Sequence, residues 1–186
     1  MVEKVNIPEI SQKHLHGIKD LTIEDINKIL DLSSFFKLSN KEKDKNHPIL
    51  KGRTIINLFF EPSTRTLISF EIAAKRLGAD VINMNIEGSS LRKGESLHDT
   101  AQTLGAMNPD LVVIRHGVDD ASKKIAEIVN CPVINAGEGI NEHPTQALLD
   151  AYTIIDNKRS LENITVSICG DLEHSRVARS NYYLLK

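Results

Sequence analysis

The sequence contains no tryptophan, and only 4% of its 186 residues are aromatic. Single-stranded nucleic acid is usually held by stacking its bases on aromatic side chains, and few such platforms exist here. Positive charge is not in excess either, because the formal net charge is −2. A protein that neutralises a phosphate backbone needs a basic surface, so we expect no nucleic-acid partner.

Long apolar runs and a cysteine framework are also missing. No uninterrupted apolar run approaches the ~20 residues that a membrane-spanning helix needs. The N-terminal stretch MVEKVNIPEISQ lacks the apolar centre of a secretory signal. The two cysteines, Cys131 and Cys169, lie far apart beside strand-like runs, which predicts reduced, buried thiols. These features predict a soluble, cytoplasmic protein that has no membrane partner.

The chain does contain a regular alternation of strand-like and helix-like segments, which follows a first amphipathic helix beginning at Thr22. Strands are expected at 53–60, 80–85, 110–115, 131–135 and 164–170, and helices at about 64–77, 95–107, 119–129 and 145–157. This series predicts an α/β fold in which a parallel sheet has helices on both faces. The polar segment at 156–163 suggests a first domain at 1–157 and the beginning of a second α/β domain at 158–186.

In such a sheet, ligands bind outside the carboxyl ends of the strands. The segment LFFEPSTRTLISFE places Ser63 at a helix cap and Thr64, Arg65 and Thr66 in the first helical turn. A cation is disfavoured at the positive end of the helix dipole unless an anion binds the N–H groups there. The alternative is an arginine that simply extends into water. The segment lacks the GxxxxGK[ST] pattern of a Walker A loop, so side chains and the helix end would hold any phosphate.

Two further segments bring polar side chains to the same edge. Arg115 closes the strand-like run DLVVIRH, so a second guanidinium should face the pocket, although a strand-end arginine can also pair with a surface acid. His143 and Gln146 lie three residues apart where NEHPTQALLD opens a helix. A neutral imidazole can donate to a carbonyl oxygen while an amide oxygen accepts from an –NH₂ group, which suits a carbamoyl group. Taken alone, HPxQ is more typical of an ordinary polar helix start with a solvent-facing histidine.

Two cations complete the candidate set. Lys93 ends a polar loop, where a flexible charge can close over a bound anion or can simply be solvated. Arg176 falls in the first turn of a last helix, in GDLEHSRVARSN, where a carboxylate would relieve the conflict with the helix dipole. His14 and His16 form an HxH pair without a nearby carboxylate or cysteine cluster, so we predict no metal site.

These motifs, in this order, resemble the aspartate carbamoyltransferases, which join carbamoyl phosphate to aspartate at the start of pyrimidine synthesis. The stretches that carry the resemblance are FFEPSTRTLISFE, SSLRKGES, VIRH, HPTQALLD and GDLEHSRVARSN. The sister ornithine enzymes share STRT and HPxQ, but their pattern usually continues STRTR and lacks KGE[ST] and GDLxHSR. Leu67 after Thr66, KGES at 93–96 and Arg176 therefore favour aspartate as the acceptor.

The resemblance implies how carbamoyl phosphate would be held. Ser63, Thr64, Arg65 and Thr66 would bind its phosphate, and Arg115 would bridge the phosphate and the carbonyl oxygen. In this scheme Arg65 and Arg115 are catalytic as well as binding residues. No metal or cofactor is implied.

The resemblance also assigns the remaining candidates. His143 would polarise the carbamoyl carbonyl, and Gln146 would orient its amino group. Lys93 would contact both phosphate and acceptor, and Arg176 would bind a carboxylate of L-aspartate. In the family, the loop that bears Ser89 and Lys93 enters the neighbouring subunit's site, which implies a homotrimer with shared active sites. Some members also bind regulatory chains or a dihydroorotase.

Family members have two domains of comparable size, whereas residues 164–186 supply only one predicted strand and one helix of the second. We therefore expect a nearly complete carbamoyl phosphate site and half an acceptor site. Three interpretations stay open: the catalytic chain of an aspartate carbamoyltransferase in truncated form, an ornithine-type or other carbamoyltransferase, and a non-catalytic fragment that binds carbamoyl phosphate.

Overall fold

The computed structural model describes residues 5–85 and 96–186, and its centre is a parallel sheet of four strands in the order β2-β1-β3-β4. The strands are β1 (Thr54–Phe59), β2 (Asp80–Asn85), β3 (Leu111–His116) and β4 (Val133–Glu138). Strand β1 is buried apart from its first residue, and the central residues of β3 are buried, which explains why these sequences are apolar runs instead of alternating patterns. The predicted α/β fold with a parallel sheet is confirmed.

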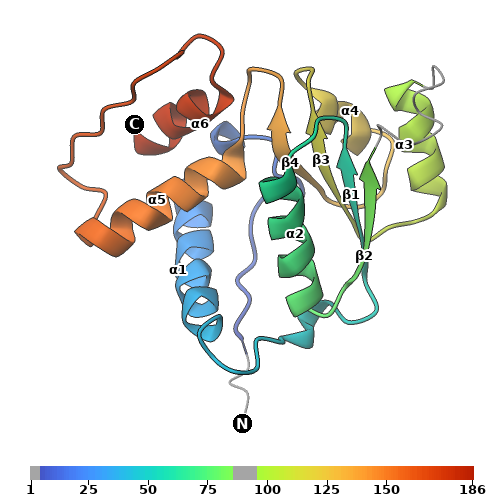
Figure 1. The fold of residues 1–186 in the computed structure, drawn as a ribbon, viewed down its shortest axis with the longest axis horizontal. Coiled ribbons are helices and arrows are strands. Elements are labelled where there is room, and N and C mark those ends of the chain that lie inside the picture. Colours follow the sequence, from blue (N-terminus) through green and yellow to red (C-terminus); the bar gives the residue numbers. More distant parts are fainter. Residues whose placement is uncertain (1–4, 86–95) are drawn as a thin grey trace.

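Helices cover both faces of the sheet (Figure 1). One side carries α1 (Ile23–Ser39), α2 (Thr64–Arg76) and α5 (Pro144–Lys158), and the other carries α3 (Leu97–Ala106) and α4 (Ala121–Ala126). Two short 3₁₀ turns, η1 (Ile18–Asp20) and η2 (Pro48–Leu50), lie on either side of α1 in the chain, and a last helix, α6, spans Arg176–Leu185. The first helix begins where the sequence predicts, because Thr22 and Asp25 form a capping box.

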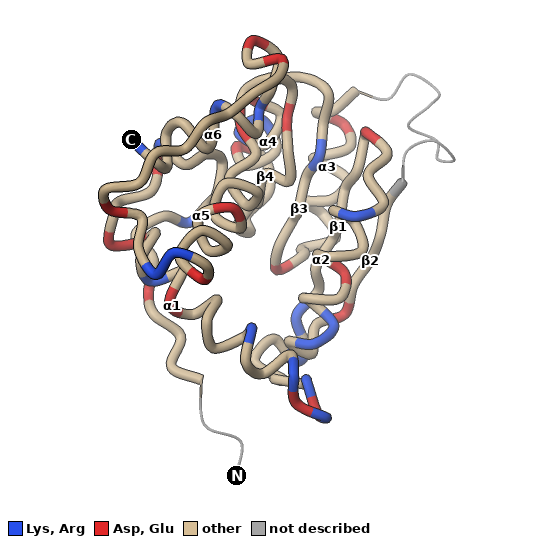
Figure 2. The backbone as a smooth tube through the Cα atoms, turned by 60° about the vertical axis from the view of Figure 1, so that its left-hand side comes forward, with Lys and Arg blue, Asp and Glu red and all other residues tan. Residues whose placement is uncertain are grey.

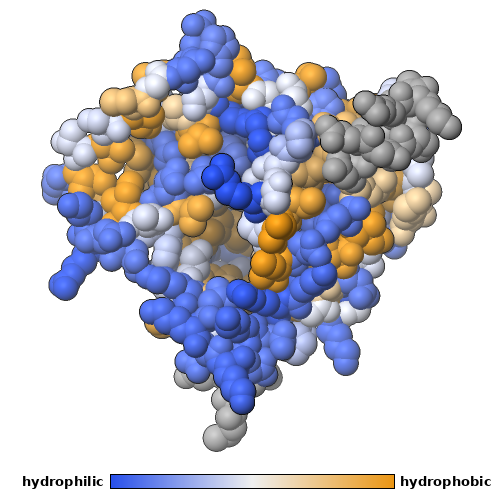
Figure 3. All heavy atoms as spheres, viewed as in Figure 1, coloured by the Kyte–Doolittle hydropathy of each residue, from blue (hydrophilic) through white to orange (hydrophobic). Residues whose placement is uncertain are grey.

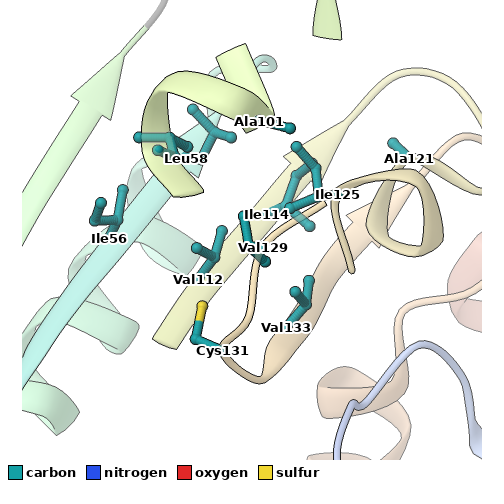
Figure 4. Packing of buried hydrophobic residues seen from close by; sticks show 11 residues of the cluster. Ile56, Leu58, Ala101, Val112, Ile114, Ala121, Ile125, Val129, Cys131 and Val133 are labelled. Carbon is teal, nitrogen blue, oxygen red and sulfur yellow. The ribbon is translucent and has the colours of Figure 1, made fainter. Parts of the chain in front are cut away.

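Successive residues of β1 point to opposite sides of the sheet and so belong to two cores. Ile56 and Leu58 face α3 and α4, where they pack with Ile125 and other fully buried side chains (Figure 4). Ile55 and Phe59 face the side on which α2 lies. These two cores hold the central strands rigidly, and so they fix the positions of the residues at the strand ends.

The strand predicted at 164–170 is wrong. This segment joins no sheet, and its apolar residues Val166 and Ile168 are 43% and 39% exposed. A β-branched run becomes a strand only when a neighbouring strand can satisfy its backbone groups, and no other strand of the described residues pairs with it. The prediction that both thiols are buried holds for Cys131 but is wrong for Cys169. Cys169 is exposed because its segment joins no sheet. The boundary between 1–157 and 158–186 stays a prediction.

Helix α6 nevertheless packs on the first domain, against α5 and η1. Asn181 Nδ2 donates to Asp150 Oδ2 of α5 at 2.7 Å. The ammonium of Lys19 lies 4.0 Å from the centre of the Tyr183 ring. Helix α6, which belongs to the predicted beginning of a second domain, is therefore held against the first domain by polar and cation–π contacts.

The surface has mixed character. Lys and Arg are interspersed with Asp and Glu along the chain (Figure 2). Exposed apolar side chains gather on the face formed by α1, α2 and α5 (Figure 3); among them, Ile72 is 43% exposed and Leu149 is 56% exposed. A cavity of about 470 Å³ lies between α1 and α2. Within the described ranges, every helix is too short or too polar to cross a bilayer.

Replacing Ile125 by alanine should destabilise the fold by about 2–5 kcal/mol, because the side chain is fully buried and its removal leaves a cavity in the core between the sheet and α4. Urea unfolding followed by circular dichroism would measure this change. The matched control is Ile23→Ala in α1, where the side chain is 80% exposed and the change should stay within about 0.5 kcal/mol. Equal effects at the two positions would contradict the described packing.

Candidate functional site

A polar cavity of about 780 Å³ opens at the carboxyl ends of the strands, the edge where a sheet of this type binds ligands. Its walls come from the start of α2, the end of β3, the start of α5 and the residues around the start of α6. The predicted site residues that line it are Ser63, Arg65, Thr66, Arg115, His143, Gln146 and Arg176. Thr64 is in the first turn of α2 but does not line the cavity. Ser89 and Lys93 lie outside the described residues, so their roles stay predictions.

The α2 wall is a helix start whose N–H groups are available to a ligand. Ser63 is the N-cap residue, but its hydroxyl does not cap the backbone and instead donates to Thr66 Oγ1 at 2.9 Å. Arg65 in the first turn is exposed, and among the described residues it has no ion pair. The positive end of the helix dipole and the guanidinium therefore both favour an anion at this place.

Arg115, at the end of β3, forms the floor of the cavity. Its side chain is only 14% exposed, and its Nη1 donates to Ala136 O at 3.1 Å. The Nε atom is buried, has no hydrogen-bond partner among the residues that the structure describes, and lies 3.6 Å from Glu61 Oε2. Burial, and then the nearby charge of Arg176, lower the pKa of Arg115. A negatively charged ligand would compensate both effects.

Arg176 approaches the same point from α6. Its Nη2 donates to Glu61 Oε2 at 2.9 Å and its Nη1 to Gly139 O at 3.2 Å. Glu61 therefore lies between the two guanidinium groups. Sequence reasoning missed this residue, although an acid directly after a strand and next to a helix start was a usable signal.

A glycine permits these side chains to converge. Gly137 has φ +108°, and a Cβ atom there would lie 2.9 Å from Arg115 Nη1 and 3.1 Å from His143 Cδ2. Both the backbone conformation and the close contacts exclude a side chain at this position. The end of β4 is thus shaped so that Arg115 and His143 can face one volume.

His143 at the start of α5 is buried, and a hydrogen bond from its backbone N–H fixes its position. Its N–H donates to Ser180 Oγ at 2.8 Å, and that hydroxyl donates to Glu142 Oε2 at 3.0 Å. Glu142 also accepts from the N–H of Ile18 at 2.8 Å. Local sequence patterns do not predict the roles of Ser180 and Glu142, because residues far apart in the chain make these contacts.

The imidazole of His143 is neutral at physiological pH. Burial, followed by the positive charges of Arg115 and Arg176, lowers the pKa of His143 to about 4. A neutral imidazole can donate one hydrogen bond to a carbonyl oxygen without carrying charge. The cavity thus combines cations and a helix end for an anion with an uncharged donor and the Gln146 amide for a neutral polar group.

Such a fold and cavity are typical of a domain that binds a small anion at the edge of a parallel sheet. A family model described as "Aspartate/ornithine carbamoyltransferase, carbamoyl-P binding domain" matches residues 13–156. The chain belongs to this family.

Curated relatives agree over nearly the whole chain. It is 58% identical to the aspartate carbamoyltransferase catalytic subunit of Pelagibacter ubique over 100% of the chain and 59% of that relative. It is 55% identical to the catalytic subunit of Parvibaculum lavamentivorans over 98% of the chain and 56% of that relative. The chain therefore spans a little over half the length of these relatives.

Solved structures match equally well. Aspartate transcarbamoylase of Trypanosoma cruzi in complex with carbamoyl aspartate and phosphate superimposes with a TM-score of 0.91 at 37% identity, over 100% of this chain and 57% of that one. The same enzyme in complex with N-(phosphonacetyl)-L-aspartic acid gives a TM-score of 0.90 at 36% identity, over 98% and 59% of the two chains.

NMR titration of the His143 ring should show a midpoint at about 4, because burial and the two arginines oppose protonation. The His143→Gln variant would assign the resonance. Since the folded pKa lies below the usual ~6.5, the unfolded chain binds this proton first, and the native state should lose stability as the pH falls from about 6.5 toward 4. A midpoint near 6.5 would contradict the described burial.

Proposed function

We propose that this chain forms the carbamoyl phosphate-binding part of an aspartate carbamoyltransferase. The protein transfers the carbamoyl group of carbamoyl phosphate to the α-amino group of L-aspartate, giving N-carbamoyl-L-aspartate and phosphate, an early step of de novo pyrimidine biosynthesis. The observation that carries the proposal is the meeting of Arg65, Arg115, His143 and Gln146 in one cavity at the start of α2. The names of the relatives support aspartate as the acceptor.

The first step is binding of carbamoyl phosphate. Its phosphate lies at the start of α2 against Ser63, Arg65 and Thr66, where the helix dipole and the guanidinium attract it. Arg115 reaches both the phosphate and the carbonyl oxygen, and the neutral imidazole of His143 donates to that oxygen. The Gln146 amide oxygen accepts from the carbamoyl –NH₂ group.

The deprotonated α-amine of aspartate then attacks the carbamoyl carbon, so that a C–N bond forms while the C–O bond to phosphate breaks. Negative charge develops on the carbonyl oxygen, where Arg115 and His143 stabilise it; such donors are typically worth ~2.7–4 kcal/mol each. The amine proton leaves with the phosphate. Holding both substrates together can contribute a further ~7–11 kcal/mol, so positioning and charge carry the rate.

Arg176 is the proposed carboxylate ligand for aspartate. It lines the same cavity as the start of α2, and one of its guanidinium nitrogens, Nη2, donates to Glu61 Oε2. Glu61 supplies one negative charge to the two arginines, and a carboxylate of aspartate would supply a second. Lys93 and Ser89 complete the site from a neighbouring subunit in a homotrimer, as the family resemblance implies.

The chain spans 59% of the Pelagibacter relative, so the proposal for these 186 residues alone is carbamoyl phosphate binding, and turnover is proposed only for a chain that spans the full length of the relatives. We place that protein in the cytoplasm. Free thiols at Cys131 and Cys169 fit a reducing compartment.

Arg65→Ala should weaken carbamoyl phosphate binding by at least tenfold, because it removes a charge-assisted contact to the phosphate worth ~1.5–3 kcal/mol. Isothermal titration calorimetry would measure the affinity. Arg53→Ala is the matched control, since Arg53 is exposed at the opposite end of β1, where it pairs with Asp110. Equal binding by the two variants would place the phosphate elsewhere.

The acceptor is tested by mixing the protein with carbamoyl phosphate and either L-aspartate or L-ornithine, and measuring the carbamoylated product. Carbamoyl aspartate alone is the expected product of a chain that spans the full length of the relatives. Carbamoyl ornithine would contradict the acceptor assignment and leave the phosphate site standing.

A further inference from the structure

Asp150 lies one helical turn after Gln146 in α5, and two different side chains use its carboxylate oxygens. Gln146 Nε2 donates to Oδ1 at 2.9 Å, and Asn181 Nδ2 of α6 donates to Oδ2 at 2.7 Å. Asn181 is 7% exposed and is itself fixed by a second bond, from Nδ2 to Val177 O at 3.1 Å. The Asp150 carboxylate is therefore held from both sides.

This arrangement removes the ambiguity that an amide side chain normally has. The two ends of a glutamine amide are almost equal in size, but a carboxylate only accepts hydrogen bonds and so selects the –NH₂ end. The Gln146 oxygen is then the end left for a ligand. Across residues 5–85 and 96–186, no protein donor contacts that oxygen, and Gln146 lines the same cavity as Arg115 and His143.

We propose that Asp150 is a positioning residue that sets the Gln146 amide so that its oxygen faces the carbamoyl –NH₂ group. The inference rests on the proposed function, because it takes that –NH₂ group as the feature recognised. Without the carboxylate, the amide can rotate by half a turn and present its own –NH₂ group, and two donors cannot pair. Asp150 thus gives the site its preference for a carbamoyl group over an acyl group that carries a methyl.

Helix α6 contributes to the same orientation of the Gln146 amide. It begins with Arg176, the proposed carboxylate ligand, and carries Asn181 five residues later. The helix that brings a cation to the acceptor side of the cavity therefore also supports the carboxylate that orients Gln146.

The test compares two stable ligands that differ in one group. Phosphonoacetamide carries an –NH₂ group next to its carbonyl, and 2-oxopropylphosphonate carries a methyl there. Calorimetry on the full chain should show that the native protein prefers the amide. In Asp150→Ala, affinity for the amide should fall roughly 3- to 10-fold, as the loss of one hydrogen bond implies, while affinity for the methyl ketone changes less than about twofold.

Two further variants separate positioning from a merely structural role. Gln146→Ala should abolish the preference, and adding Asp150→Ala to it should change nothing more, because both act through one hydrogen bond. Asn181→Ala removes one of the two contacts to the Asp150 carboxylate but leaves the bond between Asp150 and Gln146, so the preference should fall less than in Asp150→Ala.

The outcomes test the proposed function and the role of Asp150 separately. Failure of the native chain to bind either ligand would overturn the proposed function. A native preference that Asp150→Ala retains, or equal weakening of both ligands, would overturn the role of Asp150 and leave the function intact. If the alanine variant does not fold, Asp150→Asn replaces it: its amide can also donate to Gln146, so the preference should fall, and an unchanged preference would overturn the inference.

Discussion

The site depends on two guanidinium groups held around one carboxylate. Arg115 and Arg176 both line the cavity and approach Glu61 Oε2, at 3.6 and 2.9 Å. One negative charge balances one of the two cations, so the remaining positive charge acts on whatever enters the cavity. Burial, followed by the charges of Arg115 and Arg176, lowers the pKa of His143 and keeps its imidazole neutral. The charge imbalance thus attracts an anion, and together with burial it keeps the imidazole available as an uncharged donor.

The fold holds Arg115 and Arg176 close together although their positive charges repel each other. In the parallel register Phe59 lies opposite Arg115, and Phe60 N donates to Arg115 O at 2.8 Å, so the end of β3 is fixed beside the segment that leads into α2. Gly137 leaves space for the guanidinium, and the bond from His143 N to Ser180 Oγ fixes the start of α5. The packing of the strands and of α6 therefore offsets the repulsion between the two guanidinium groups.

Sequence patterns predict the parts of this arrangement that are local. The four strands and the helices between them follow from apolar runs and turn residues, and the strand-end rule brings Arg115 and the start of α2 to one edge. Ser180 was missed because tertiary packing selects its partners, whereas Glu61 had a local signal in its place between a strand and a helix start. The run at 164–170 was predicted to be a strand on local propensity, but pairing is not a local property. The chemical roles of the site residues stay predictions.

A crystal structure of the chain with phosphonoacetamide bound would test the account most directly. We predict the phosphonate at the N–H groups of the first turn of α2 beside Arg65, with the carbonyl oxygen between Arg115 and His143. The amide nitrogen should face the Gln146 oxygen. A ligand bound elsewhere, for example in the cavity between α1 and α2, or one whose phosphonate avoids the start of α2, would contradict the central claim.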